Sequence, residues 1–147
     1  MNRERVRPVE ILLVEDSPTD ALLAREALQS SKMVNNLHHV VDGVEATDFL
    51  YRRGKYPAAP RPDVILLDLN LPRKDGRELL AEIKSDEELK RIPVVVLTTS
   101  EAESDVLTAY GHHANCYIVK PVDFQKFSHV VQSIEGFWFA VVTLPKE

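Results

Sequence analysis

The stretch that decides the fold is Val64-Ile65-Leu66-Leu67-Asp68-Leu69-Asn70-Leu71-Pro72-Arg73-Lys74-Asp75-Gly76. Its four consecutive aliphatic residues, 64–67, predict a strand that is buried on both faces, as in a parallel sheet. A desolvated carboxylate is expensive, so Asp68 belongs at the carboxyl end of this strand, where the chain leaves the core. The polar run from Asn70 to Gly76 then turns the chain into a helix. Open α/β folds place their chemistry at this edge of the sheet, so Asp68 is the first candidate site residue.

The composition narrows the class of protein. With 147 residues we expect a single domain over 1–147, with a core at about 9–134 and an apolar extension at about 135–147. The net charge of −5 and the lack of a Lys/Arg stripe argue against a nucleic-acid partner. Cys116 is the only cysteine and no apolar run is long enough to span a bilayer. We therefore expect a cytoplasmic protein with no membrane partner.

Five short apolar runs alternate with helical patterns along the chain. The predicted strands cover residues 9–14, 37–41, 64–67, 94–97 and 116–119. Capping residues precede the helices: Ser17 with Asp20, Asp42 with Glu45, Ser100 with Glu103, and Asp123. This alternation predicts an α/β fold in which helices cover both faces of a five-stranded parallel sheet.

Polar side chains follow four of the five predicted strands. Parallel strands share a direction, so their carboxyl ends bring together Glu15, Asp16, Asp68, Thr98 and Lys120. Neighbouring carboxylates repel one another unless a cation is present, and Asp16 and Asp68 with a backbone carbonyl are hard oxygen ligands for Mg²⁺. A lysine ammonium and a threonine hydroxyl suit the oxygens of a phosphoryl group. The set therefore predicts phosphoryl transfer onto a carboxylate nucleophile.

Each of these signals also has a simpler interpretation. Glu15 and Asp16 could only cap the first helix, residues 98–100 could only begin another, and Lys120 could be an ordinary surface lysine. Their occurrence together at the ends of four strands favours the functional interpretation.

On these residues the sequence resembles the receiver domains of two-component response regulators. The resemblance rests on Glu15-Asp16, on Asp68 within 66–72, on the turn at Gly76, on 98–100 and on Lys120-Pro121. It implies a flavodoxin-like receiver fold with the sheet order 2-1-3-4-5.

The resemblance also implies the chemistry of the site. Asp68 would accept a phosphoryl group from a phosphohistidine of a sensor histidine kinase. Asp16, Asp68 and the backbone carbonyl of Asn70 would bind Mg²⁺, and Glu15 would act on the metal through a water. Glu15 stands where the family more commonly has Asp. The glutamate side chain is longer than that of aspartate, and the metal site remains credible with it.

Two further roles follow from the resemblance alone. Thr98 and Lys120 would hold the phosphoryl oxygens. Thr98 and Tyr117 would carry the conformational switch, because Tyr117 falls at the aromatic switch position of the family.

A narrower resemblance is to the single-domain regulators that serve phytochrome-type photoreceptor kinases. It rests on the Pro-rich segment 56–62, on 115–117 and on the apolar tail 137–145. The tail predicts a homodimer through Phe137, Trp138 and Phe139, because one domain cannot easily cover an appendage that is apolar on both sides. The alternative is that the tail folds back onto its own domain.

Two other functions fit parts of the pattern. An aspartyl-phosphate phosphatase would carry its nucleophile at the end of the first strand, with a second acid at the position that Asn70 occupies here. A receiver-like module that works without phosphorylation would not need the complete acidic set, Thr98 and Lys120. We therefore expect a stand-alone phospho-acceptor rather than an enzyme that acts on an external substrate.

Overall fold

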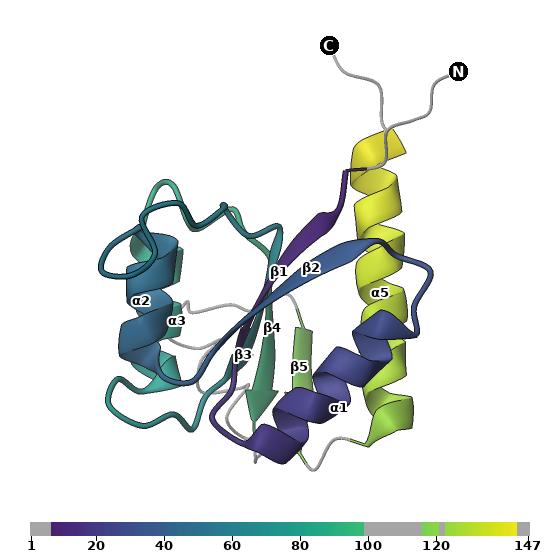
Figure 1. Cartoon of the computed structure of the whole chain (residues 1–147), viewed down its shortest axis with the longest axis horizontal. Helices are drawn as coiled ribbons and strands as arrows, with labels where there is room; N and C mark the ends of the chain where they lie inside the picture. The colour runs from purple at the N-terminus through teal and green to yellow at the C-terminus, as the bar shows by residue number, and fades with distance from the viewer. Residues whose placement is uncertain (1–6, 99–115, 121–122, 144–147) are drawn as a thin grey trace.

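The computed structural model describes residues 7–98, 116–120 and 123–143 (Figure 1). The strands are β1 (Val9–Val14), β2 (Asn35–Val40), β3 (Val64–Asp68), β4 (Val94–Thr98) and β5 (Cys116–Val119). The helices are α1 (Pro18–Gln29), α2 (Gly43–Leu50), α3 (Gly76–Ser85) and α5 (Phe124–Thr143). The helix that the sequence predicts after Ser100 lies outside the described residues. No helix in the described part of the chain is both long and apolar enough to cross a membrane.

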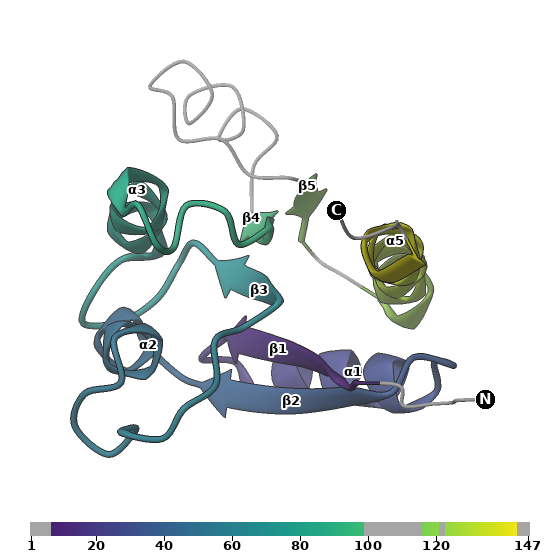
Figure 2. The ribbon, with the colours of Figure 1, turned by 90° about the horizontal axis from the view of Figure 1, so that it is seen from above.

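The strands form one parallel sheet in the order β2-β1-β3-β4-β5, which confirms the predicted topology. Helices α1 and α5 lie together on one face of the sheet, and α2 and α3 lie on the other (Figures 1 and 2). Right-handed crossovers between parallel strands produce this two-sided arrangement. All five strands therefore end at the same edge, where α1 begins.

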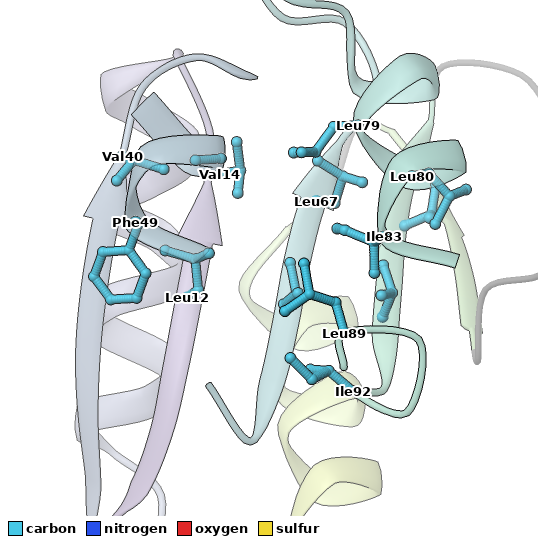
Figure 3. Close-up of a cluster of buried hydrophobic side chains, with 14 of the residues drawn as sticks. Leu12, Val14, Val40, Phe49, Leu67, Leu79, Leu80, Ile83, Leu89 and Ile92 are labelled. Carbon is cyan, nitrogen blue, oxygen red and sulfur yellow. The ribbon is translucent and has the colours of Figure 1, made fainter. Parts of the chain in front are cut away.

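Two apolar clusters fill the space between the sheet and its two layers of helices. On the α2–α3 face, Leu79, Leu80 and Ile83 of α3 point toward the strands (Figure 3). On the opposite face, α1 and α5 cover alternate residues of the same strands, such as Ile11 and Leu66. All residues of β3 are buried, as a central strand covered on both sides requires.

The boundaries of β2, β3 and β4 differ from the predicted ones. Strand β2 begins at Asn35, two residues early, because Asn35 pairs with Val9 and its side-chain amide donates to the carbonyl oxygens of Leu28 and Met33. It ends at Val40, because the amide of the next residue donates to the Glu45 carboxylate at the start of α2. Strands β3 and β4 each extend one residue beyond the predicted ranges 64–67 and 94–97, to Asp68 and Thr98.

Helix α3 begins in close contact with the end of β3. A Cβ atom at Gly76 would lie 2.4 Å from the carbonyl oxygen of Asp68 and 2.6 Å from the Cα of Leu69. The amide of Gly76 also donates to the carbonyl oxygen of Leu69 at 3.0 Å. The turn predicted at Gly76 is therefore a point where two backbones touch, and only glycine fits there.

We predict that Gly76→Ala lowers the free energy of unfolding by about 1–3 kcal/mol, the usual cost of inserting an atom into a filled space. Urea denaturation measures this change. Glu78→Ala, at an exposed position of the same helix, is the matched control and should change stability little. Equal stability of the two variants would show that the contact at Gly76 is not restrictive.

Candidate functional site

The register of the sheet places two carboxylates side by side at the carboxyl edge. Val14 of β1 pairs with Leu67 of β3, so the next residues, Glu15 and Asp68, become neighbours. Both are almost completely buried, Glu15 at 1% exposure and Asp68 at 2%. Asp16 follows Glu15 and is exposed. One carboxylate oxygen from each of these three acids lies within 4.8 Å of the others.

Lys120, directly after β5, brings a positive charge into this group. Its Nζ lies 3.1 Å from Oδ2 of Asp68, and 3.3 and 3.4 Å from the two carboxylate oxygens of Glu15. The backbone also fixes this position, because the amide of Lys120 donates to the carbonyl oxygen of Thr98 at 2.7 Å. The structure thus joins Glu15, Asp68, Thr98 and Lys120, as the strand-end pattern predicts.

The electrostatics of the site follow from burial and from these contacts. Burial raises the pKa of the Glu15 carboxyl to about 7, and the charge of Asp68 acts in the same direction. The amide of Ser17 and the charge of Lys120 oppose that rise. Burial lowers the pKa of Lys120, but its bonds to Asp20 and Asp68 and the charge of Glu15 outweigh burial and raise the pKa above its usual range. Lys120 therefore remains a cation at neutral pH.

A third acid contacts this lysine, and the sequence interpretation did not assign it to the site. Oδ2 of Asp20 lies 2.8 Å from Nζ of Lys120. The sequence predicts that Asp20 completes a capping box with Ser17, which is correct only in part. The Ser17 hydroxyl accepts the amide of Asp20 at 3.2 Å, but the amide of Ser17 donates to the Glu15 carboxylate. The Asp20 side chain is therefore directed to the site, and no local sequence signal distinguishes this use from capping.

Neighbouring elements hold the loops that carry the acids. The amide of Glu15 donates to the carbonyl oxygen of Val40, and the carbonyl oxygen of Glu15 lies 2.7 Å from Nε2 of His39. His38 contacts the Glu10 carboxylate instead, so the two histidines of β2 act separately.

The loop between β3 and α3 rests on the start of α2. Arg73, whose φ of 65° is in the left-handed region, lies 3.3 Å from Asp42, the residue that caps α2. Nζ of Lys74 donates to the Thr47 hydroxyl at 2.9 Å. A Cβ atom at Gly43 would lie 2.2 Å from the carbonyl oxygen of Lys74, so the loop and the helix touch. These contacts fix the segment that includes Asn70.

The other predicted site residues occupy the following places. Asn70 is exposed, and its amide donates to Oδ1 of Asp68 at 3.0 Å. Thr98 ends β4 and is 1% exposed. Tyr117 lies on β5, half-buried against the cluster of the α2–α3 face. Phe137, Trp138 and Phe139 lie in α5, which continues as a helix to Thr143, and their side chains are outside the described residues.

The donor set fits a small divalent cation. Three carboxylate oxygens converge, which is the type of ligand that Mg²⁺ and Mn²⁺ prefer. Asp16 is exposed, so the site has a side that is open to water and to an incoming phosphate. Lys120 offsets only part of the negative charge of Glu15, Asp16 and Asp68, so a cation would be stabilised there.

Comparison with known proteins identifies the family and relatives that cover almost the whole chain. Residues 11–132 match the family model described as the response regulator receiver domain. The chain is 52% identical over 145 residues to the response regulator Rcp1 of Synechocystis sp. (strain ATCC 27184 / PCC 6803 / Kazusa), covering 99% of each chain.

Solved structures show the same likeness in three dimensions. A crystal structure of the Mn²⁺-bound form of response regulator Rcp1 matches with a TM-score of 0.79 and 52% identity, over 95% of this chain and 100% of that one. The phosphorylated cyanobacterial phytochrome response regulator RcpA matches with a TM-score of 0.80 and 51% identity, over the same shares of the two chains.

We predict that Glu15 makes the cation-free protein less stable as the pH rises. The pKa of Glu15 is raised in the folded state, so the stabilisation from its protonated form is complete below about pH 4.5 and is lost as the pH passes 7. Between pH 5 and 8, the free energy of unfolding of the parent should fall by up to about 3 kcal/mol more than that of Glu15→Gln. Chemical denaturation in the presence of a chelator measures this difference, and equal pH slopes would contradict it.

Proposed function

The chain belongs to the response regulator receiver domain family, and we propose that its Asp68 accepts a phosphoryl group in a reaction that requires Mg²⁺. The observation that carries this proposal is the partly buried contact of 3.1 Å between Nζ of Lys120 and Oδ2 of Asp68. A carboxylate at the end of a buried strand is costly unless it is paired. A mobile lysine charge beside it is suited to a group that gains negative charge.

The proposed reaction breaks the P–N bond of a phosphohistidine and forms a bond between a carboxylate oxygen of Asp68 and phosphorus. Asp16, Asp68 and the carbonyl of Asn70 would hold Mg²⁺, with Glu15 acting through a water, and the bound cation would supply positive charge for the phosphoryl oxygens. Lys120 and the Thr98 hydroxyl would hold those oxygens. This is phosphoryl transfer by positioning and charge, with no base needed to activate the nucleophile.

We further propose that Thr98 and Tyr117 turn the new charge into a change of conformation. Thr98 lies at the end of β4, and its carbonyl oxygen accepts the amide of Lys120. A hydroxyl drawn toward a phosphoryl oxygen would leave room for Tyr117 to turn inward. Such a change follows only if the phosphoryl group contacts the two conformations differently.

The phosphoryl donor that we propose is a phytochrome-type sensor histidine kinase. The support for it is the 51% identity to a structure described as a phytochrome response regulator, which covers 95% of this chain. Membership of the receiver family also argues against an enzyme that acts on an external substrate. The position of Asp68 on β3 and the amide at Asn70 argue in addition against a phosphatase of the aspartyl-phosphate type.

We predict that the parent gains the mass of one phosphoryl group when it is incubated with acetyl phosphate and Mg²⁺, and that Asp68→Asn gains none. Asparagine keeps the shape of the side chain but cannot act as the nucleophile. Intact-protein mass spectrometry measures the gain, and a chelator should abolish it. A phosphorylated phytochrome-type kinase should give the same result. Full labelling of Asp68→Asn would show that the acceptor is another residue.

We also propose that the protein forms a homodimer through its C-terminal region. Helix α5 extends to Thr143, nine residues beyond Ile134, which among the α5 side chains that the structure describes is the last one in the apolar cluster shared with α1. The final nine residues include Phe137, Trp138 and Phe139, and large aromatic residues often dominate interfaces. A twofold contact would pair the same surface of each copy.

We predict that the full chain sediments as a dimer at micromolar concentration and that a chain ending at Glu135 sediments as a monomer. The truncation removes the aromatic residues but keeps the buried residues of α5 through Ile134. Circular dichroism is the control that the shortened chain still folds. A monomeric full-length chain, or a dimeric shortened chain, would contradict the proposal.

A further inference from the structure

The contact between Lys120 and Asp20 is the shortest that this lysine makes with an acid of the described chain. Nζ lies 2.8 Å from Asp20, 3.1 Å from Asp68, and 3.3 and 3.4 Å from the two oxygens of Glu15. An ammonium has three N–H donors, which is one for each of these three carboxylates. Lys120 is therefore already paired with three carboxylates before any phosphoryl group arrives.

Helix α1 holds Asp20 in place without needing its carboxylate for the cap. The Ser17 hydroxyl caps the helix by accepting the amide of Asp20, and Pro18 occupies the first turn. An asparagine at this position would keep that amide and the shape of the side chain. The carboxylate of Asp20 can thus be removed while the local fold is preserved.

We propose that Asp20 is a positioning residue that holds Lys120 toward α1, and so limits the charge that Lys120 provides to a phosphoryl group on Asp68. This inference rests on the proposed phosphorylation of Asp68. A phosphoryl group would have to compete with Asp20 for the same ammonium. Asp20 is 34% exposed, whereas Asp68 is almost fully buried, so water stabilises the Asp20 charge when the lysine moves away.

The competition has a defined consequence for the rate of phosphoryl uptake. Without the Asp20 charge, Lys120 would contact only Asp68 and Glu15 and could move toward the incoming phosphoryl oxygens at lower cost. An acid in the first turn of α1 also interacts favourably with the helix dipole. That second role affects the stability of the protein, and it would not make the effect of Asp20 on the uptake rate depend on Lys120.

The test compares initial rates of phosphoryl uptake from acetyl phosphate with Mg²⁺, followed by intact mass. We expect Asp20→Asn to be about two- to fivefold faster than the parent, the range that one partly exposed ion pair allows. Glu26→Gln removes one negative charge from an exposed position six residues further along α1 and should leave the rate unchanged. Equal rates for Asp20→Asn and Glu26→Gln would overturn the inference.

A second pair of variants separates positioning from a simple effect of charge. In a Lys120→Met background, uptake should be slow and Asp20→Asn should give no further gain. An equal gain in both backgrounds would show that Asp20 acts through space on the donor, which would also overturn the inference. If the parent takes up no phosphoryl group, the proposed function fails and this inference fails with it. If the parent is labelled and Asp20→Asn is no faster, only this inference fails.

Discussion

The ion pair between Lys120 and Asp68 offsets part of the negative charge that folding brings to the carboxyl edge of the sheet. It joins residues 52 positions apart, and the contacts of the same lysine with Glu15 join residues 105 positions apart. Asp68 and Glu15 are both almost fully buried, so neither could remain there as an unpaired charge at low cost. The lysine therefore connects the ends of β1, β3 and β5 at one point.

The surrounding structure fixes the positions of the residues that contact Lys120. Pairing of β1 with β2 and β3 fixes Glu15, with His39 on its carbonyl oxygen. The close approach of α3 at Gly76 fixes the backbone of Asp68 from the other side. The segment after Asp68 is anchored on α2 through Arg73 and Lys74. A rigid frame around a lysine with a flexible stem is suited to sensing the arrival of one additional charge.

Most of the fold could be predicted from the sequence because the local signals are strong and agree. The aliphatic run before Asp68 gives a central strand, and Asp42 and Asp123 cap the helices that they precede. The same strand-end rule brings Glu15, Asp68, Thr98 and Lys120 together. Asp20 could not be assigned in this way, because a capping acid and a site acid look identical in sequence.

The sequence pattern could not predict features that depend on contacts between side chains far apart in the sequence. Strand β2 starts at Asn35 because of hydrogen bonds to the end of α1, which no property of Asn35 alone predicts. The role of His39 depends on its position beside Glu15, which follows only from the register of two strands. The periodicity of apolar residues predicts helices and strands well, but the contacts between them can be identified only once the sheet is assembled.

Phosphorylation of Asp68 is tested most directly by a crystal structure of the protein with Mg²⁺ and beryllofluoride, which mimics a phosphoryl group on a carboxylate. If Asp68 is the phospho-acceptor, beryllofluoride should lie on Asp68 with Nζ of Lys120 within hydrogen-bond distance of a fluoride, and Mg²⁺ should lie between Asp16, Asp68 and the carbonyl of Asn70. Beryllofluoride on another residue, or Mg²⁺ bound without Asp68, would contradict that assignment.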